Sequence, residues 1–393
     1  MSYDEYRELS LCDGYLEDDN LWFSNNSFNA LCRLNLKSIK IDVIDTFSRR
    51  KKWEKKIHRK IIEHNNFFYL IPNFGNEIDI YNRITGEQSF AKIPEQYLQN
   101  NGYFVADALA ANDCIWIFPW NSYQSVIVYN ILENQFYQDI ILTHKLKEFT
   151  GTILTYKSVC LDKDWFWMPI LYSNCIISYN WKSKEIREFR VNLDNLYSIY
   201  KMNRNIWLGT WDTEIIYIWN YETNQLKKIG QGIGKNSNPY FNPIVIKNEV
   251  YILSKSEEII HFTDKGAEKI RIECNGVKIN TNLPYIFTCI YNNKLFLLPY
   301  QMKYMIWVDL SNKYAKALEF KMSESFVLSN YYKDYKLPFL RDELKKEVIF
   351  EDRDFSLDEL KKILELKKET ANVKKHSNAG ESILVFSCSE LLR

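Results

Sequence analysis

Residues 103–139 read YFVADALAANDCIWIFPWNSYQSVIVYNILENQFYQD. The segment holds four short runs rich in Ile, Val, Tyr and Phe, a composition typical of β-strands. The polar residues between the runs are ones that favour turns. The segment therefore predicts four consecutive antiparallel strands, over Tyr103–Ala110, Cys114–Phe118, Val126–Tyr129 and Gln135–Asp139.

A four-residue motif within this segment, Asp113-Cys114-Ile115-Trp116, recurs along the chain. It consists of a polar residue, a spacer, an aliphatic residue or Phe, and an aromatic residue. Seven copies, 40 to 51 residues apart, end in Trp22, Phe68, Trp116, Trp167, Trp207, Tyr251 and Phe296. A period of this length with four strands per unit is typical of a ring of sheets that pack on one another. In such a ring the recurring aromatic ring would fill the space between adjacent sheets.

A second motif follows the first in each unit and marks the end of the third strand. It pairs a large residue with Asn or Asp, as in Tyr81-Asn82 and Trp219-Asn220, and the sixth unit departs from it with Phe262-Thr263. The short polar stretch after each pair, such as residues 83–87, is suited to a tight hairpin.

We therefore predict an all-β chain whose residues 1–321 form a seven-bladed β-propeller of four-stranded antiparallel blades. A six-bladed ring with one divergent unit is the alternative blade count. A β-sandwich or β-solenoid is the alternative architecture, but a sandwich gives no reason for seven equivalent motifs. Over about residues 13–321 the repeat resembles the kelch-like and related bacterial propeller superfamilies in its layout, which implies the fold and carries over no functional residue.

The last part of the chain, residues 322–393, does not continue the repeat and is expected to be a C-terminal extension. Ser356 and Glu359 form a capping box ahead of an apolar stripe, which predicts a helix over about residues 357–368. A second short helix is expected over residues 379–392. We expect both to pack on the propeller, with a partner-binding tail as the alternative. Either Tyr6–Leu11 or Glu347–Phe350 is expected to complete a blade and close the ring.

Composition limits the class of protein further. The 51 Lys and Arg balance the 50 Asp and Glu to a net charge of +1, which argues against a nucleic-acid partner. No run of 18 apolar residues predicts a membrane span, and the first residues do not resemble a secretion signal. The eight cysteines form no CxxC pair, so we expect reduced thiols and no metal. These features predict a cytoplasmic protein with no cofactor.

Function is expected on one face of the ring, which we call the loop face. It carries the connections between the second and third strands of each blade and the connections between blades. Six of the seven loops between second and third strands combine an aromatic residue with Asn, Ser, Thr, Asp or Gln, a mixture suited to recognition. The alternative is that these rings fold inward and cap the blades. The candidate binding residues are Phe74, Trp120, Tyr123, Tyr172, Trp211, Tyr300 and Tyr304.

A run of basic residues, RRKKWEKKIHRK at positions 49–60, lies in the connection between the first two units. It is expected on the loop face, where it would either bind a phosphate or acidic segment or remain a solvated loop.

Two hypotheses about function follow. The first is a non-enzymatic binding or scaffold protein that recognises a peptide, a protein or a modified substrate, with carbohydrate as a further ligand class. The second is a carbohydrate-active or other small-substrate enzyme with its active site at the mouth of the central channel. The chain contains neither an HExxH nor a GxSxG motif, so the sequence leans towards the first and offers no catalytic residue.

Overall fold

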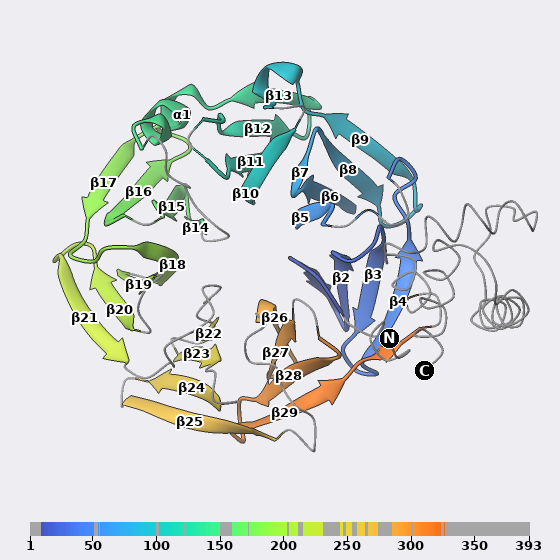
Figure 1. Ribbon diagram of the computed structural model, residues 1–393, viewed down its shortest axis with the longest axis vertical. Helices are drawn as coiled ribbons and strands as arrows, with labels where there is room; N and C mark the ends of the chain where they lie inside the picture. The colour runs from blue at the N-terminus through green and yellow to red at the C-terminus, as the bar shows by residue number, and fades with distance from the viewer. Residues whose placement is uncertain are drawn as a thin grey trace, which may run out of the picture.

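The computed structural model describes residues 9–326, apart from positions 51–53, 55, 100–101, 122, 150–158, 172, 203, 211–214, 231–243, 247–248, 254–257, 264–265, 274–284, 300–301 and 324–325. Seven small antiparallel sheets of four strands each are arranged in a closed ring (Figure 1). This confirms the predicted seven-bladed propeller. The expected helices of residues 357–368 and 379–392, and the expected closing strand Glu347–Phe350, lie outside the described residues.

Each blade runs from its innermost to its outermost strand in chain order. Blade 1 consists of β1 (Tyr15–Glu17), β2 (Asn20–Ser24), β3 (Leu31–Asn35) and β4 (Lys40–Asp45). Blade 2 consists of β5 (His58–His64), β6 (Phe67–Pro72), β8 (Glu77–Asn82) and β9 (Gln88–Lys92). Blade 3 consists of β10 (Tyr103–Ala111), β11 (Cys114–Pro119), β12 (Ile127–Asn130) and β13 (Gln135–Gln138). Blade 4 consists of β14 (Cys160–Asp162), β15 (Trp165–Pro169), β16 (Cys175–Asn180) and β17 (Ile186–Arg190).

The remaining three blades repeat this order. Blade 5 consists of β18 (Leu196–Met202), β19 (Asn205–Thr210), β20 (Ile216–Asn220) and β21 (Gln225–Gly230). Blade 6 consists of β22 (Ile244–Ile246), β23 (Glu249–Leu253), β24 (Glu258–Thr263) and β25 (Gly266–Glu273). Blade 7 consists of β26 (Tyr285–Tyr291), β27 (Lys294–Pro299), β28 (Tyr304–Asp309) and β29 (Tyr314–Glu319). Four short elements lie outside this scheme: β7 (Phe74–Gly75), η2 (Glu95–Tyr97), α1 (Ile140–Lys147) and β30 (Lys321–Met322).

The apolar core is divided among the seams between blades. Seven buried clusters each draw side chains from two neighbouring blades, and the last joins blade 7 to blade 1. The recurring aromatic residue on the second strand lies in these seams, as expected. Trp116 of blade 3, for example, contacts Phe166 of blade 4 with ring centroids 5.2 Å apart. A sheet with two apolar faces thus buries each face against a neighbour.

In blade 2 the recurring aromatic residue is Tyr69, one residue after the predicted Phe68. In blade 3, Cys114 pairs with Asn130, and the aromatic Trp116 follows Cys114 by two residues. In blade 2, Phe67 pairs with the equivalent Asn82, and the residue two places later is Tyr69. Tyr69 packs in the seam between blades 2 and 3, and Phe68 points the other way, towards Trp22 of blade 1. A shift of one residue along a strand reverses the face of the side chain. With this correction each of the seven seams has one such aromatic residue.

The second motif closes the hairpin between the third and fourth strands. The side-chain oxygen of Asn220 accepts the backbone N–H groups of Glu222 and Thr223, both at 3.0 Å. Asn224, just before the fourth strand, adopts a left-handed conformation with φ of 54°. The same side-chain turn recurs at Asn35, Asn82, Asn130, Asn180 and Asp309. The polar residue therefore satisfies backbone groups that the turn leaves without strand partners.

The ring is closed by pairing outside the four-stranded blades. β30 adds to the outer edge of blade 1, parallel to β4, and Phe326 packs on Phe28 at a centroid distance of 5.3 Å. Residues 6–8 of the expected strand Tyr6–Leu11 lie outside the described residues; Leu9 and Leu11 form isolated bridges, to Met302 and Asn25, and belong to none of the blade strands. Blade 1 already has four strands of its own, so neither end of the chain has to supply one.

Replacement of Asn220 by Ala should lower the free energy of unfolding by about 1 kcal/mol, because two backbone N–H groups lose their acceptor. Urea denaturation followed by circular dichroism measures the change. The matched control is Glu222→Ala in the same turn, whose exposed ion pair with Arg204 contributes little. Equal stability of the two variants would contradict the role of the Asn220 side chain.

Candidate functional site

Three exposed aromatic residues and the half-buried Trp120 lie on the loop face where blades 2 and 3 meet. We call Phe74, Phe104, Trp120 and Tyr123 the aromatic corner. β7, which carries Phe74, lies within the loop between β6 and β8 and pairs with the start of β10 in blade 3. The rings of Phe74 and Phe104 lie 4.1 Å apart at 32° and are each 44% exposed. Tyr123 is 63% exposed, and the backbone N–H of Trp120 donates to the carbonyl of Phe104 at 2.9 Å.

Backbone contacts hold the corner in place. A Cβ atom at Gly102 would stand 2.2 Å from the ring of Phe74, so only glycine allows the ring to lie against the chain here. The buried Gln124 accepts the N–H of Phe104 through its side-chain oxygen at 3.3 Å. The side-chain oxygen of Asn121 accepts the N–H groups of Tyr123 and Gln124. The exposed rings thus stand on a loop whose shape is fixed before any ligand arrives.

The structure brings together three of the seven predicted binding residues. Phe74, Trp120 and Tyr123 lie at the corner, whereas Tyr304 begins β28 on blade 7, away from it (Figure 1). Tyr172, Trp211 and Tyr300 lie outside the described residues. Sequence reasoning missed Phe104, because it belongs to a first strand and only loops were searched. The Gly102-Tyr103-Phe104 sequence, an aromatic pair at a strand start, was the available signal.

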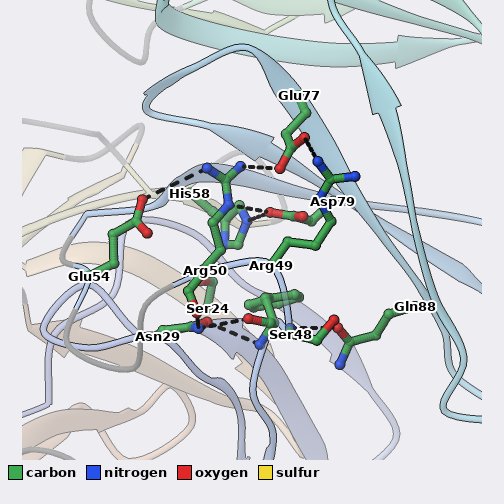
Figure 2. Close-up of polar contacts among 11 residues, drawn as sticks. Ser24, Asn29, Ser48, Arg49, Arg50, Glu54, His58, Glu77, Asp79 and Gln88 are labelled. Atoms are coloured by element: carbon green, nitrogen blue, oxygen red, sulfur yellow. Dashed lines mark hydrogen bonds and ion pairs between the residues drawn. The ribbon is translucent and has the colours of Figure 1, made fainter.

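A buried polar network lies beside the corner, in the seam between blades 1 and 2 (Figure 2). Ser24 at the end of β2 contacts Nδ1 of His58 at 2.7 Å, and Nε2 of His58 contacts Asp79 at 2.8 Å. Arg50 reaches the same Asp79 carboxylate at 3.2 Å and Glu77 at 3.5 Å. Because all of these side chains are largely buried, the network ties the connection between the blades to blade 2.

The ionisation of this network follows from its burial. Burial lowers the pKa of His58 below its ordinary 6.5, against the opposing effect of Asp79. Burial would raise the pKa of Asp79, but the hydrogen bond from His58 and the charge of Arg50 outweigh it, so this pKa is lowered. A neutral His58 then donates from Nε2 to Asp79 and accepts the Ser24 hydroxyl at Nδ1. Ser24, His58 and Asp79 are the residue types of a hydrolytic triad, but they are 6%, 3% and 4% exposed.

Several described residues of the basic run at positions 49–60 make contacts within the protein, whereas positions 51–53 and 55 lie outside the described residues. Arg49 covers the ring of Phe90, 3.6 Å from its centroid, and pairs with Glu77. Arg59 is buried and donates to the carbonyl of Ala106 in blade 3. Lys60 pairs with Asp107 at 3.3 Å. Arg49, Arg59 and Lys60 thus contact groups of blades 2 and 3, and these described residues of the run help to connect the blades.

In the parts of residues 9–326 that are described, no group of three His, Cys, Asp or Glu side chains is placed to hold a metal ion. Within the same residues no helix is long and apolar enough to cross a membrane. The six described cysteines carry free thiols, and burial raises the pKa of Cys160 and Cys289 to about 12. The thiols of Cys160 and Cys289 are therefore protonated and unreactive at neutral pH.

The comparisons with known proteins support the fold. No family model matches the chain, and no curated protein matches its sequence. The computationally designed Ika8 protein aligns with a TM-score of 0.51 and 7% identity, over 77% of this chain and 84% of Ika8. PorZ, an essential bacterial surface component of the type-IX secretion system of Porphyromonas gingivalis, aligns with a TM-score of 0.53 and 11% identity, over 79% of this chain. The aligned region is 38% of PorZ, so this chain corresponds to well under half of that protein.

Hsv2 of Kluyveromyces lactis aligns over 79% of this chain and 98% of its own, with 9% identity and a TM-score of 0.49. At 7% and 11% identity the likeness to Ika8 and PorZ shows the fold alone. Together with the ring of seven four-stranded sheets, the likeness to these two proteins defines the chain as a β-propeller protein.

The His58 network gives a pH prediction. Below pH 6.5 the unfolded chain takes up a proton on His58 that the folded chain, with its lowered pKa, does not. The stability that His58 provides is therefore present above pH 6.5 and is lost as the pH falls. We expect His58→Gln to be less stable than the parent at pH 7.5, and the difference to shrink towards pH 5.5 by up to about 1.4 kcal/mol per pH unit.

Urea titrations of both proteins across this pH range measure the difference, and the other histidines cancel because both proteins contain them. A difference that grows on acidification would show that His58 is charged in the folded protein.

Proposed function

We propose that the protein is a binding protein that captures an extended segment of a peptide or protein partner at the aromatic corner. The observation that carries the proposal is the exposed pair of Phe74 and Phe104, with the exposed Tyr123 in the loop whose Trp120 and Gln124 bond to the Phe104 backbone. Rigid aromatic rings offer large contact areas at a low entropic cost, and the half-buried Asn121 amide beside them can donate to a peptide backbone. Free buried thiols support a reducing compartment such as the cytoplasm.

The enzyme hypothesis has weaker support. An active site needs reactive groups that a substrate can reach. The Ser24, His58 and Asp79 side chains face one another inside a seam, and Phe47 packs on the His58 ring at 4.7 Å. Such a network is suited to fixing the blades. The corner itself presents rings and amides, which favour recognition over catalysis.

Panning a phage-displayed random peptide library on the protein tests the proposal. Peptides that enrich should lose about 30-fold in affinity for Phe74→Ser combined with Tyr123→Ser, since two exposed anchors are removed. Fluorescence polarisation with a labelled peptide measures this loss. Ile84→Ser is the matched control, because Ile84 is 76% exposed in the β8–β9 hairpin and lies outside the corner.

Peptides that bind the double variant as well as the parent would exclude the corner as their site. If no peptide enriches while a glycan array gives a signal that needs Phe74, the ligand is a carbohydrate and the peptide proposal is wrong.

A further inference from the structure

One of the seven outer strands, β13, differs from the other six because it contains no charged residue. A strand at the edge of a sheet exposes unpaired N–H and C=O groups, and charged side chains commonly protect such edges from pairing with other chains. Charged residues occur in six of the outer strands: β4, β9, β17, β21, β25 and β29. β13, with the sequence Gln135-Phe136-Tyr137-Gln138, contains none.

The surroundings of β13 are apolar as well. Of the twelve large hydrophobic side chains that are exposed in the described residues, four lie within residues 132–141. Leu132 precedes the strand and is 72% exposed, Tyr137 is 40% exposed, and Ile140 and Ile141 open α1 at 60% and 47%. This patch is on the outer rim of the ring, whereas the aromatic corner is formed by loops of the loop face (Figure 1).

The backbone of β13 is available for pairing on one side. All four of its residues pair with β12, from Asn130–Gln135 to Ile127–Gln138, and β13 ends the strand order of its sheet. In an antiparallel ladder alternate residues direct both backbone groups outward, so the other edge of β13 offers hydrogen bonds to an incoming strand. Blade 1 illustrates such an addition, because β30 extends it on the outer edge of β4.

We propose that β13 pairs antiparallel with β13 of a second copy of this chain and joins the two third blades into one continuous sheet. The sequence of the strand is suited to its own copy. A two-fold axis beside Tyr137 sets the two Tyr137 residues opposite each other, a favourable aromatic cross-strand pair, and sets each Phe136 opposite Gln138 of the other copy. The same axis brings Leu132 of one copy towards the Ile140 and Ile141 end of the other.

Charge does not oppose the pairing. The chain has a net charge of +1, and β13 itself is uncharged, so two copies meet without long-range repulsion. A four-residue strand with four flanking apolar side chains makes a small interface, which predicts a dimer with a dissociation constant on the order of micromolar. The dimer leaves the aromatic corner free, because the interface lies on the outer rim.

Sedimentation velocity of the full chain between about 1 and 100 μM tests the proposal. The parent should shift from monomer towards dimer across this range. Tyr137→Lys sets two like charges near the two-fold axis and should raise the dissociation constant at least about tenfold. Ile84→Lys, an equally drastic change at an exposed isoleucine elsewhere, should leave it unchanged.

Hydrogen exchange of the parent protein gives a second measurement that does not depend on a variant. The outward amides of residues 135–138 should exchange more slowly at 100 μM than at 1 μM. A parent that stays monomeric with unchanged exchange overturns the proposal. So does a dimer that Tyr137→Lys and Ile84→Lys affect equally, or one in which exchange at β13 does not respond to concentration.

Discussion

The structure depends on the packing of an aromatic ring into each seam between neighbouring blades. A four-stranded sheet with two apolar faces cannot bury them alone, and this chain buries both by closing seven such sheets into a ring. One aromatic residue of the second strand stands in every seam. The indole N–H groups of Trp116, Trp167 and Trp207 are buried with no hydrogen-bond acceptor in the described part of the chain. The seams therefore use these rings for their area and shape, at the cost of unsatisfied donors.

The seam between blades 1 and 2 adds polar contacts at the loop face. There Ser24, His58 and Asp79 continue the seam outward from the apolar cluster around Phe68 and Leu70. Arg50 and Glu77 fix the connection that crosses from one blade to the next. These contacts, with the pair of Lys60 and Asp107, anchor the described start of blade 2, the blade from which β7 carries Phe74. Rigid support of this kind is what a binding loop requires.

Sequence patterns predicted the architecture because the propeller repeats its constraints in every blade. The strands expected over Tyr103–Ala110 and Cys114–Phe118 differ from β10 and β11 by one residue at one end. The face of a side chain was harder to predict: Phe67, Phe68 and Tyr69 are all aromatic, so the motif alone could not select Tyr69 for the seam. For the site, loop composition identified Phe74, Trp120 and Tyr123.

Other features of the site depend on contacts between residues far apart in the chain. Phe104 stacks on Phe74 from the neighbouring blade, and the pairing of β7 with β10 has no signal in local sequence. The ion pairs of Arg50 and Lys60 could not be predicted, because their partners Glu77, Asp79 and Asp107 come 20 to 50 residues later in the chain. Charge in a sequence does not reveal whether the fold itself supplies the counter-ion.

The most direct test of the seam as the basis of this fold is a double-mutant cycle on Trp116 and Phe166, which meet between blades 3 and 4. The free energies of unfolding of Trp116→Ala, Phe166→Ala and the double variant are measured in urea. We expect a coupling of about 1 kcal/mol between the two rings. Effects that add to within about 0.3 kcal/mol would show that the rings do not interact across the seam, and would contradict the account.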